Sequence, residues 1–465
     1  MKLRISFLLL GLVLLIAIPF SQVNAQESGP IYIVQPGDTL TAIAQRFGTT
    51  VEALVEVNDI EDPSLLFPGM ELIIPGFEEI QGVLVIHEVG YGETLSSLSR
   101  RFRSPSDTIA RLNRIVSPGR LYAGLPLVVT EVEENNSSLM GPSLLLPLTG
   151  ESKLELAMSE GVNPWSLNTL DQDELRMWVV PGTPVVLPGG GQWTTTLPDP
   201  IHSIDIQPLP AEQGRTTEIR MEFSQPTWVE GRLGDRSLNF FALDPNHFVA
   251  LQGIHALEEP GLYELEIRLY PSQGSAMTYF FTQPIRVQAG YYGFEEINGV
   301  PPRTIDPEVV DPEQELVESI LSQVSYNKLW QGPFKYPSDH YTENFVSVFG
   351  TRRTYNNGAY DYYHTGLDFY GSNSPIMASA PGKVVFSGPL IVRGNATYID
   401  HGWGVYSGYF HQSEMYVSVG DSVELGQVIG RVGGTGRSTG PHLHWEIWVG
   451  GIPVNPLEWV ETEFP

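Results

Sequence analysis

An internal repeat constrains the fold of this chain more than any other feature of its sequence. Eight residues of one segment recur 55 positions later without a gap. The first set is Gly37, Thr39, Leu40, Phe47, Asn58, Leu66, Gly69 and Leu72, and the second is Gly92, Thr94, Leu95, Phe102, Asn113, Leu121, Gly124 and Leu127. A weaker third copy follows at an offset of 113, and two framing glycines stand 32 residues apart in all three copies. Self-similarity at a constant offset indicates copies of one small module.

The residue pattern predicts that each module runs strand, helix, helix, strand. Residues 32–34 form a short β-rich run, and Asp38 stands where it can cap the helix that follows. The apolar residues within 40–47 keep helical spacing on one face. Thr49, with Glu52 three residues later, has the pattern of a capping box for a second helix. Two helices packed on a two-stranded sheet can bury one small core.

The first copy resembles a LysM domain, through residues 34–40 (Val-Gln-Pro-Gly-Asp-Thr-Leu), Asn58 and residues 67–69. The second copy matches through residues 92–95 (Gly-Glu-Thr-Leu) and Asn113. The resemblance implies a βααβ fold and binding to glycans that contain N-acetylglucosamine, which means peptidoglycan or chitin. The alternative is that the repeats are only spacers.

The third copy departs from the LysM pattern. It keeps the frame of glycines, but Lys153 replaces the core leucine and the phenylalanine is missing. We therefore expect a degenerate LysM-like module here, and whether it binds glycan is left open.

The N-terminus has the layout of a secretory signal peptide. Lys2 and Arg4 precede a largely apolar run at 5–20, and residues 23–25 (Val-Asn-Ala) offer a small-residue cleavage site. The apolar run is short for a membrane span, which needs about 20 residues. We expect residues 1–25 to be removed and the mature protein to work outside the cytoplasm, associated with the cell wall. An uncleaved membrane anchor is the alternative.

Charge and cysteine content exclude several classes of function. The chain has 54 acidic and 26 basic side chains among 465 residues, a net charge of -28, so it is a poor candidate for binding nucleic acid. It has no cysteine, which excludes disulfides, thiolate zinc sites and a cysteine nucleophile.

The middle of the chain changes character. Seven short β-rich runs, separated by Pro, Gly and Asp turns, fall between residues 201 and 287 and predict an Ig-like antiparallel β-sandwich. This segment contains no catalytic pattern, and we expect a spacer or accessory domain. Four prolines at 301–312 lie in an acidic stretch that predicts a linker. A helix is expected at 313–324, closing onto the last domain.

Six of the ten histidines lie in the last 126 residues, in runs typical of an all-β domain. His442-Leu443-His444 is the most informative pair. In a strand, residues two apart point to the same face, so His442, His444 and Glu446 share one face while the residues between them enter the core. The two imidazoles, about 7 Å apart at the backbone, can converge on one ion and one substrate atom.

A second group of metal-ligand type lies at residues 364–368. In an extended strand His364 and Asp368 would stand about 13 Å apart, too far for one zinc ion, but Gly366 between them permits a bend. One Asp with two histidines supplies three protein ligands and leaves a fourth position open for water, as in a catalytic zinc site. Imidazole and carboxylate suit zinc without excluding other divalent ions.

Residues 345–460 as a whole resemble the lysostaphin/LytM-type zinc endopeptidases of peptidoglycan. The resemblance rests on the two histidine groups, on Tyr409-Phe410-His411 and on the run 433–441 (Gly-Gly-Thr-Gly-Arg-Ser-Thr-Gly-Pro). It implies Zn²⁺ as the cofactor. The metal ligands that it implies are His364, Asp368 and His444, and the catalytic histidines are His442 and His411. The family has Leu after the latter, where this chain has Gln412.

Together the two resemblances imply a secreted zinc metalloendopeptidase that hydrolyses peptide bonds of bacterial peptidoglycan and is anchored to wall glycan. Two alternatives stay open: a non-catalytic, wall-binding activator of an amidase, and a latent glycan-binding scaffold. The pattern leaves the cleaved bond, the oligomeric state and the acid or base role of each catalytic histidine open.

The expected organisation is multidomain. Its segments are 1–25 (signal peptide), 31–76 and 86–130 (LysM domains), 145–189 (degenerate LysM-like module), 199–290 (Ig-like β-sandwich), 291–340 (linker and helix) and 341–465 (zinc peptidase domain, all-β).

Overall fold

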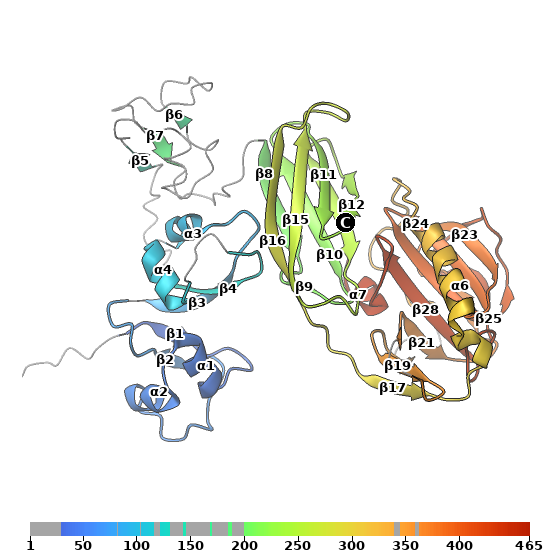
Figure 1. The fold of residues 1–465 in the computed structure, drawn as a ribbon, viewed down its shortest axis with the longest axis horizontal. Coiled ribbons are helices and arrows are strands. Elements are labelled where there is room, and N and C mark those ends of the chain that lie inside the picture. Colours follow the sequence, from blue (N-terminus) through green and yellow to red (C-terminus); the bar gives the residue numbers. More distant parts are fainter. Residues whose placement is uncertain are drawn as a thin grey trace, which may run out of the picture. The chain divides into compact units, whose positions relative to one another are not determined.

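The computed structural model describes residues 29–80, 82–102, 104–115, 121–130, 143–145, 168–169, 185–187, 200–338, 345–358 and 362–465. It divides into two compact units, Met1–Val85 with Thr130–Val132, and Ile86–Val129 with Glu133–Pro465. The expected signal peptide, and most of the expected third module, lie outside the described residues. Figure 1 labels the elements along the chain.

The first module has the predicted order of strand, helix, helix, strand. Its elements are β1 (Ile31–Ile33), α1 (Leu40–Phe47), α2 (Val51–Val57) and β2 (Glu71–Ile73), and β1 pairs antiparallel with β2. The helix caps differ from the expected ones. Thr39 caps α1 through the N–H of Ala42, and Thr50 caps α2. Asp38 instead accepts the hydroxyl of Tyr32 at 2.6 Å, so it supports the turn before the helix.

The second module repeats this order. Its elements are β3 (Val83–Glu88), α3 (Leu95–Arg101), α4 (Ser106–Leu112) and β4 (Pro126–Thr130). The repeated asparagine explains part of the internal similarity. Asn58 exchanges hydrogen bonds with the backbone of Leu54 and Ile73, and Asn113 does the same with Ile109 and Val128. In each module this side chain therefore ties the end of the second helix to the last strand.

Three short strands are described between residues 143 and 187. They are β5 (Ser143–Leu145), β6 (Asn168–Thr169) and β7 (Val185–Leu187), and β7 pairs antiparallel with both others. The rest of the expected module at 145–189 lies outside the described residues.

The central segment is a β-sandwich, as its strand pattern predicts. One sheet has the order β13-β14-β10-β8 and the other β12-β11-β15-β16-β9, and they enclose one hydrophobic core. Figure 1 shows the strands of this sandwich in green and yellow-green. Its strands are β8 (Ile201–Gln207), β9 (Ala211–Glu212), β10 (Thr216–Phe223), β11 (Trp228–Leu233), β12 (Arg236–Leu238), β13 (Phe240–Ala242), β14 (His247–Gly253), β15 (Gly261–Tyr270) and β16 (Tyr279–Gln288).

The C-terminal segment is built mainly of strands, with one short closing helix, α7 (Pro456–Glu461). Within the described residues, ten strands join in one sheet whose main path is β18-β21-β28-β25-β24-β23-β26. The strands are β18 (Phe345–Ser347), β21 (Leu367–Tyr370), β22 (Pro375–Met377), β23 (Gly382–Pro389), β24 (Asn395–Gly402), β25 (Val405–Met415), β26 (Ser422–Val423), β27 (Val428–Val432), β28 (His442–Val449) and β29 (Ile452–Val454). A smaller sheet has the order β17-β19-β20, with β17 (Phe294–Ile297), β19 (Arg352–Tyr355) and β20 (Tyr362–Tyr363).

The segment expected to be a linker is an integral part of this C-terminal domain. Strand β17 pairs in parallel with β19 along its whole length. It is followed by η3 (Pro302–Ile305) and helix α6 (Pro307–Leu321), so the helix begins six residues before the expected start. The reason is that Pro307 occupies the first helical position, which suits proline, while Asp306 caps the helix through the N–H of Glu308.

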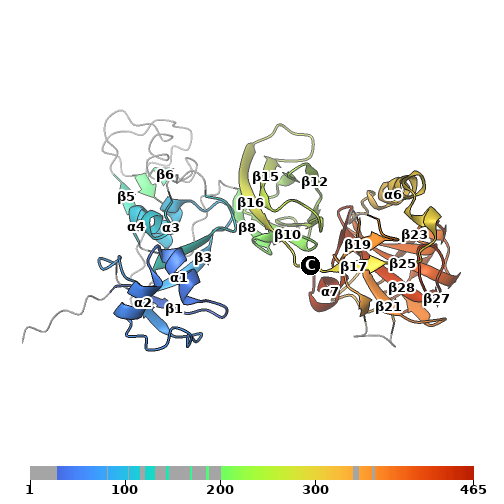
Figure 2. The same ribbon diagram turned by 60° about the horizontal axis from the view of Figure 1, so that its bottom comes forward.

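Helix α6 packs on the C-terminal sheet through an apolar stripe. Val317 and Leu321 are buried in a cluster with side chains of β24, β25 and β28, which include Tyr398, Tyr406 and Trp448. Figures 1 and 2 both show α6 lying across the strands of the C-terminal domain.

The sandwich and the C-terminal domain share one continuous hydrophobic core. Phe241, Val249 and Leu251 of the sandwich belong to the same buried cluster as Trp403 and Trp459. The ring of Phe241 stacks on that of Trp403 with centroids 5.0 Å apart. The sandwich is therefore packed into the C-terminal domain rather than attached as a loose spacer.

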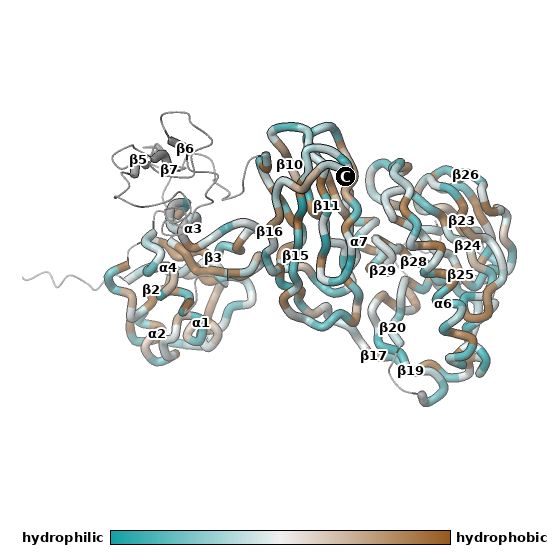
Figure 3. The backbone as a smooth tube through the Cα atoms, turned by 45° about the horizontal axis from the view of Figure 1, so that its top comes forward, coloured by the Kyte–Doolittle hydropathy of each residue, from teal (hydrophilic) through white to brown (hydrophobic). Residues whose placement is uncertain are grey.

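Hydrophobic and hydrophilic residues alternate in short stretches along the chain (Figure 3). Among the residues that the structure describes, no helix has the length and apolar character needed to cross a membrane.

A buried carboxyl group at this shared interface makes a prediction about stability. Burial raises the pKa of Glu458 from 4.5 to about 7, although Arg215 lies 3.4 Å away and the Thr216 N–H donates to the carboxylate. A carboxyl group whose pKa is raised on folding stabilises the fold below its unfolded pKa, and this contribution is lost as pH rises from about 4.5 to about 7. We expect Glu458→Gln to remove up to about 3 kcal/mol of this pH dependence, measured by denaturant unfolding between pH 4.5 and pH 8.

The matched control is Glu461→Gln, an exposed glutamate on the same helix. It should unfold with the pH profile of the original chain. If Glu458→Gln gave that same profile, Glu458 would titrate normally and the interface would not depend on its protonation.

Candidate metal centre and catalytic cleft

Strand pairing brings the metal-ligand candidates together. Strands β21 and β28 pair antiparallel in a register that sets Asp368 directly opposite His444 and Tyr370 opposite His442. Residues directly opposite on antiparallel strands have Cβ atoms about 5 Å apart and share one face of the sheet. The two distant groups of the sequence are therefore joined by a single hydrogen-bonded ladder.

Gly366 is needed for close packing. A Cβ atom at this position would lie 2.2 Å from the carbonyl oxygen of Trp445 and 3.0 Å from Nε2 of His444. The absence of a side chain thus lets the chain before β21 pass against β28 and carry His364 to the other two residues. The chain bends at Gly366, as the sequence analysis expects, and the glycine is also required because a side chain would not fit at this position.

Three atoms form a compact triangle of potential ligands. Nε2 of His364 lies 2.9 Å from Oδ1 of Asp368 and 2.9 Å from Nδ1 of His444, and the latter nitrogen lies 2.8 Å from the same oxygen. All three side chains are buried. Ligand atoms around a tetrahedral zinc ion with bonds near 2.1 Å stand about 3.4 Å apart, so a small outward movement fits the triangle to zinc.

The outer nitrogens of the two ligand histidines are already bound. Nδ1 of His364 lies 2.9 Å from the carbonyl oxygen of Val348, and Nε2 of His444 lies 3.0 Å from Oε1 of Glu446. Each acceptor requires a proton on that nitrogen, which leaves the lone pair of the inner nitrogen free for a cation. This is the usual way in which a second layer of residues fixes the tautomer of a metal ligand.

Electrostatics also favour the forms of His364 and Asp368 that bind metal. Burial lowers the pKa of His364 to about 4, so the imidazole is neutral at pH 7. Burial acts in the opposite sense on Asp368, but the imidazoles of His364 and His444 outweigh it and hold the pKa of this carboxyl well below its usual value. Neutral imidazole and ionised carboxylate are the required ligand forms.

His442 and His411 lie beside this triangle with the same arrangement of nitrogens. Nδ1 of His442 lies 2.9 Å from the carbonyl oxygen of Gly440, and Nδ1 of His411 lies 2.7 Å from that of Thr435. Their rings are 4.7 Å apart between centroids, and Nε2 of His442 is 3.8 Å from Oδ1 of Asp368. The structure thus gathers all five residues that the sequence analysis named.

The backbone of His411 is strained. Its φ of +59° lies in the left-handed region, which residues with a side chain adopt at a cost of about 1–2 kcal/mol. Its N–H donates to the carbonyl oxygen of Arg393 at 3.0 Å, which helps to hold this conformation. Strain of this kind is typical of residues whose side chain is aimed at a functional site.

Gln412, the departure from the family pattern, and the nearby His401 both lie outside the cleft. The amide of Gln412 is buried and donates to Oγ1 of Thr397 and to the carbonyl oxygen of Tyr409, so it points away from the site. His401 is also buried and lies between the carbonyl oxygen of Pro381 and the hydroxyl of Ser407, which gives it a structural role.

Arg353 is a site residue that the sequence analysis missed. Its guanidinium group donates to Oδ2 of Asp368 at 2.9 Å and to Glu295 at 3.1 Å. Side chains alternate along a strand, so in β19 Arg353 faces the site while Arg352 does not line the cleft. The alternation of side chains would have shown that Arg352 and Arg353 face opposite sides of a strand. The sequence, however, did not reveal that these residues form a strand.

A second missed group joins the cleft to helix α6. The carboxylate of Glu313 accepts the backbone N–H groups of Ile391, Val392 and Arg393, and the guanidinium group of Arg393 at 3.1 Å. Burial of this glutamate, at the start of the predicted helix, has no local sequence signal, because its partners lie about 80 residues away.

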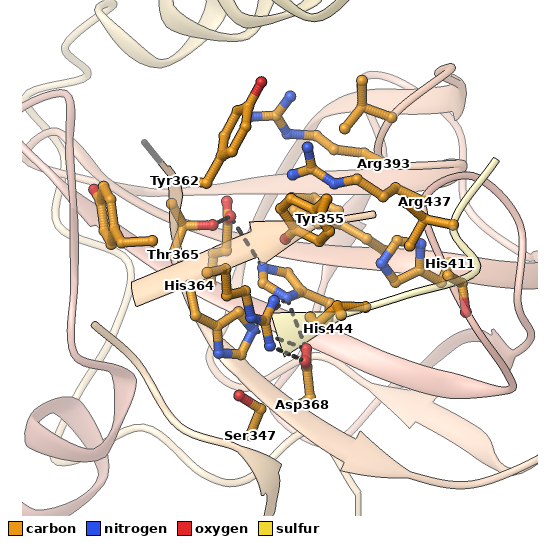
Figure 4. Close-up of a pocket in the computed structure, with 18 of the residues that line it drawn as sticks. Ser347, Tyr355, Tyr362, His364, Thr365, Asp368, Arg393, His411, Arg437 and His444 are labelled. Carbon is orange, nitrogen blue, oxygen red and sulfur yellow. Dashed lines mark hydrogen bonds and ion pairs between the residues drawn. The ribbon is translucent and has the colours of Figure 1, made fainter. Parts of the chain in front are cut away.

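The metal-ligand candidates, His411, His442, Arg353 and Arg393 line a cleft of about 770 Å³. One wall comes from the metal-ligand strands and the run before His442, and the other comes from β17, α6 and the β19–β20 hairpin. Figure 4 shows His364, Asp368 and His444 converging, with Tyr355, Tyr362, Arg393 and Arg437 grouped nearby.

The comparisons with known proteins assign the class of both regions. Residues 362–456 match the model of peptidase family M23, and residues 32–75 and 87–130 match the LysM domain. The chain therefore carries two LysM domains and a C-terminal M23 peptidase domain, as the sequence resemblance implies.

Three relatives show the likeness in detail. The chain is 47% identical over 95 residues to the DD-carboxypeptidase/endopeptidase Mpg of Neisseria meningitidis, which is 20% of this chain and 22% of that one. It is 43% identical over 94 residues to the peptidoglycan DD-endopeptidase ShyC of Vibrio cholerae, with the same coverage. The structure of lysostaphin from Staphylococcus simulans is matched at 30% identity, over 25% of this chain and 49% of that one, with a TM-score of 0.22. The chain spans about a fifth of the length of the curated relatives that it matches.

Glu446 makes a prediction about metal affinity. Its carboxylate holds Nε2 of His444, accepts the indole N–H of Trp448 at 2.6 Å and accepts the hydroxyl of Thr365. Loss of such an outer partner costs about 10- to 100-fold in metal affinity. We expect Glu446→Gln to weaken zinc binding by this factor, measured by competition with a chelating dye.

The exposed residue Glu424 provides the matched control. Glu424→Gln makes the same chemical change away from the site and should leave zinc affinity unaltered. Equal affinities for the two variants would mean that Glu446 does not orient the metal ligand.

Proposed function

We propose that this protein is a secreted zinc metalloendopeptidase that hydrolyses peptide bonds of bacterial peptidoglycan. The observation that carries the proposal is the triangle of His364, Asp368 and His444, whose three inner ligand atoms converge beside a cleft. The match to peptidase family M23, and the peptidoglycan endopeptidase among the relatives, support peptidoglycan peptides as the substrate class.

The residues of the cleft can divide the chemistry between them. His364, Asp368 and His444 would hold a zinc ion, which when bound would supply a water of pKa about 7 and a Lewis acid for the scissile carbonyl. His411 and His442 lie side by side in the cleft with ring centroids 4.7 Å apart, and their Nδ1 nitrogens are held by carbonyl groups, which leaves Nε2 of each to exchange a proton. One of these histidines takes the proton of the attacking water, and the other stabilises the oxyanion or protonates the leaving amine.

The site argues against a purely non-catalytic role. A wall-binding activator of an amidase needs neither the metal ligands nor a matched pair of outer acceptors that fix their tautomers. Here both ligand histidines and both predicted catalytic histidines have such acceptors. Hydrolysis requires histidines with defined tautomers, which explains why all four have such acceptors.

The LysM domains supply the proposed anchor. We infer that they hold the enzyme on glycan containing N-acetylglucosamine, outside the cytoplasm, and so raise the local concentration of peptide substrate without adding catalytic contacts. In the first LysM domain, Leu65 and Phe67 are large apolar side chains that are more than half exposed, as expected of a surface that contacts the apolar face of a sugar.

The catalytic proposal predicts different outcomes for two histidine variants. His364→Ala should lose both bound zinc and cleavage of purified peptidoglycan, because it removes a ligand. His442→Ala should keep its zinc and lose cleavage by about 100-fold or more, because it removes a proton carrier. Zinc content by elemental analysis and released peptides by chromatography measure the two effects.

His401→Ala is not a suitable control, because that histidine is buried in the fold. His247→Ala changes an exposed histidine of the sandwich and should retain both zinc and activity. Full cleavage by His364→Ala or His442→Ala would refute the assignment of these residues.

Anchoring makes a separate prediction. We expect Phe67→Ala to weaken binding of the full chain to insoluble peptidoglycan by about tenfold, since it removes an exposed aromatic surface. Cleavage of soluble peptides should not change. Sedimentation with purified sacculi measures the binding, and Phe280→Ala, which removes a half-exposed ring of the sandwich, is the control. Unchanged sedimentation of Phe67→Ala would exclude this surface as the glycan contact.

A further inference from the structure

The arginines that line the cleft differ in their partners. Arg353 is paired with Asp368 and Glu295, and Arg393 is paired with Glu313. In the part of the chain that the structure describes, no carboxylate lies within 4.0 Å of the guanidinium group of Arg437. An arginine that faces a cleft without an acidic partner has hydrogen-bonding capacity available for a ligand.

Arg437 is nevertheless held in place, by aromatic rings. Its guanidinium carbon lies 4.5 Å from the ring centroid of Tyr355 and 5.5 Å from that of Tyr362. These two tyrosine rings pack edge to face with centroids 5.5 Å apart. The backbone N–H of Arg437 donates to the carbonyl oxygen of Val392 at 2.8 Å, which fixes the base of the side chain.

This mode of support leaves the donors free. Stacking uses the flat face of a guanidinium group, whereas its five N–H groups lie in the plane and point outward from the edge. Within the described residues, the one hydrogen bond that these donors make is long, 3.5 Å from Nη1 to the carbonyl oxygen of Thr304. The planar fork that remains matches the two oxygens of a carboxylate.

The position of Arg437 relates it to the proposed reaction. It stands five residues before His442, in the run of residues 433–441 that leads into β28. Figure 4 shows Arg437 beside Tyr355, with His411 nearby and His444 below, so the guanidinium group shares the cleft with the metal-ligand triangle.

We propose that Arg437, supported by Tyr355 and Tyr362, forms a subsite that binds a carboxylate group of the peptide substrate. The inference rests on the proposed function and adds a requirement to it: the substrate carries a free carboxylate near the scissile bond. Peptidoglycan peptides contain such groups, and amidation of the carboxylate removes the charge that the fork recognises.

The charge of the opposite wall makes this placement selective. Glu296, Asp311 and Glu318 line the cleft from β17 and α6, and all three are exposed. A substrate carboxylate is repelled from that wall and attracted to Arg437, so a peptide that carries one carboxylate has a preferred orientation in the cleft. The two walls thus favour one direction of binding.

Direct binding measurements on full-length protein test the proposal. The probes are synthetic stem peptides in which each carboxylate in turn is replaced by a carboxamide, titrated by calorimetry into metal-free protein. We expect one replacement to weaken binding about 10- to 100-fold, the range for a charge-assisted hydrogen-bonded pair. Arg437→Gln should bind this amide and the parent peptide equally, and Arg437→Lys should keep part of the discrimination.

The matched control is Arg303→Gln, which makes the same charge change at an exposed arginine that does not line the cleft. It should discriminate between the peptides as the original chain does. The proposal is overturned if no carboxamide binds more weakly, or if Arg437→Gln weakens all the peptides by one common factor, which would mean that the arginine only packs against the tyrosines.

The same peptides, offered to zinc-loaded protein as cross-linked substrates, separate this inference from the proposed function. Absence of any cleavage by the original chain counts against the endopeptidase, while the binding data still decide the role of Arg437. If cleavage occurs, the carboxamide that binds weakly should raise KM more than it lowers kcat.

Discussion

The pairing register of two strands is the constraint on which the whole site depends. A shift of one residue between β21 and β28 would turn Asp368 away from the face that carries His444. The register is fixed by burial, because Leu367 and Phe369 on one strand and Leu443 and Trp445 on the other fill the core from the opposite face. The metal ligands are therefore positioned by the packing of their apolar neighbours.

Four imidazoles surround this ladder: those of His364, His411, His442 and His444. Each is positioned by its own strand or turn and by a hydrogen-bond acceptor on one ring nitrogen. The acceptors are three backbone carbonyl groups and one buried carboxylate. A backbone carbonyl group only accepts hydrogen bonds, so the tautomers of His364 and His411 are set by the backbone. Nδ1 of His442 lies near the hydroxyl of Ser438, at 3.3 Å, as well as the carbonyl oxygen of Gly440. His444 differs, because its partner Glu446 is itself held by Trp448 and Thr365.

The sequence was sufficient to predict those parts of the molecule that depend on local spacing. The constant offset of 55 predicted repeated modules, and the alternation around His442 and His444 predicted a strand with a polar face. What could not be predicted depends on contacts between distant residues. Glu313 on α6 binds backbone groups about 80 positions away, and the pairing of β17 with β19 joins segments separated by more than 50 residues. The prolines at 302 and 307, which suggested a linker, instead begin a 3₁₀ helix and an α-helix. A proline is common both at the first position of a helix and in a linker, so the sequence alone does not distinguish the two.

The two walls of the cleft have different origins in the chain. The metal ligands and the predicted catalytic histidines lie within residues 362–456, the part that matches the peptidase family, whereas β17 and α6 precede that part by 40 residues or more. The metal ligands and the acidic wall of the cleft are consequently encoded in separate stretches of sequence. Substitutions at the exposed residues Glu296, Asp311 and Glu318 can therefore change the charge of the cleft while the strands that carry the metal ligands stay unchanged.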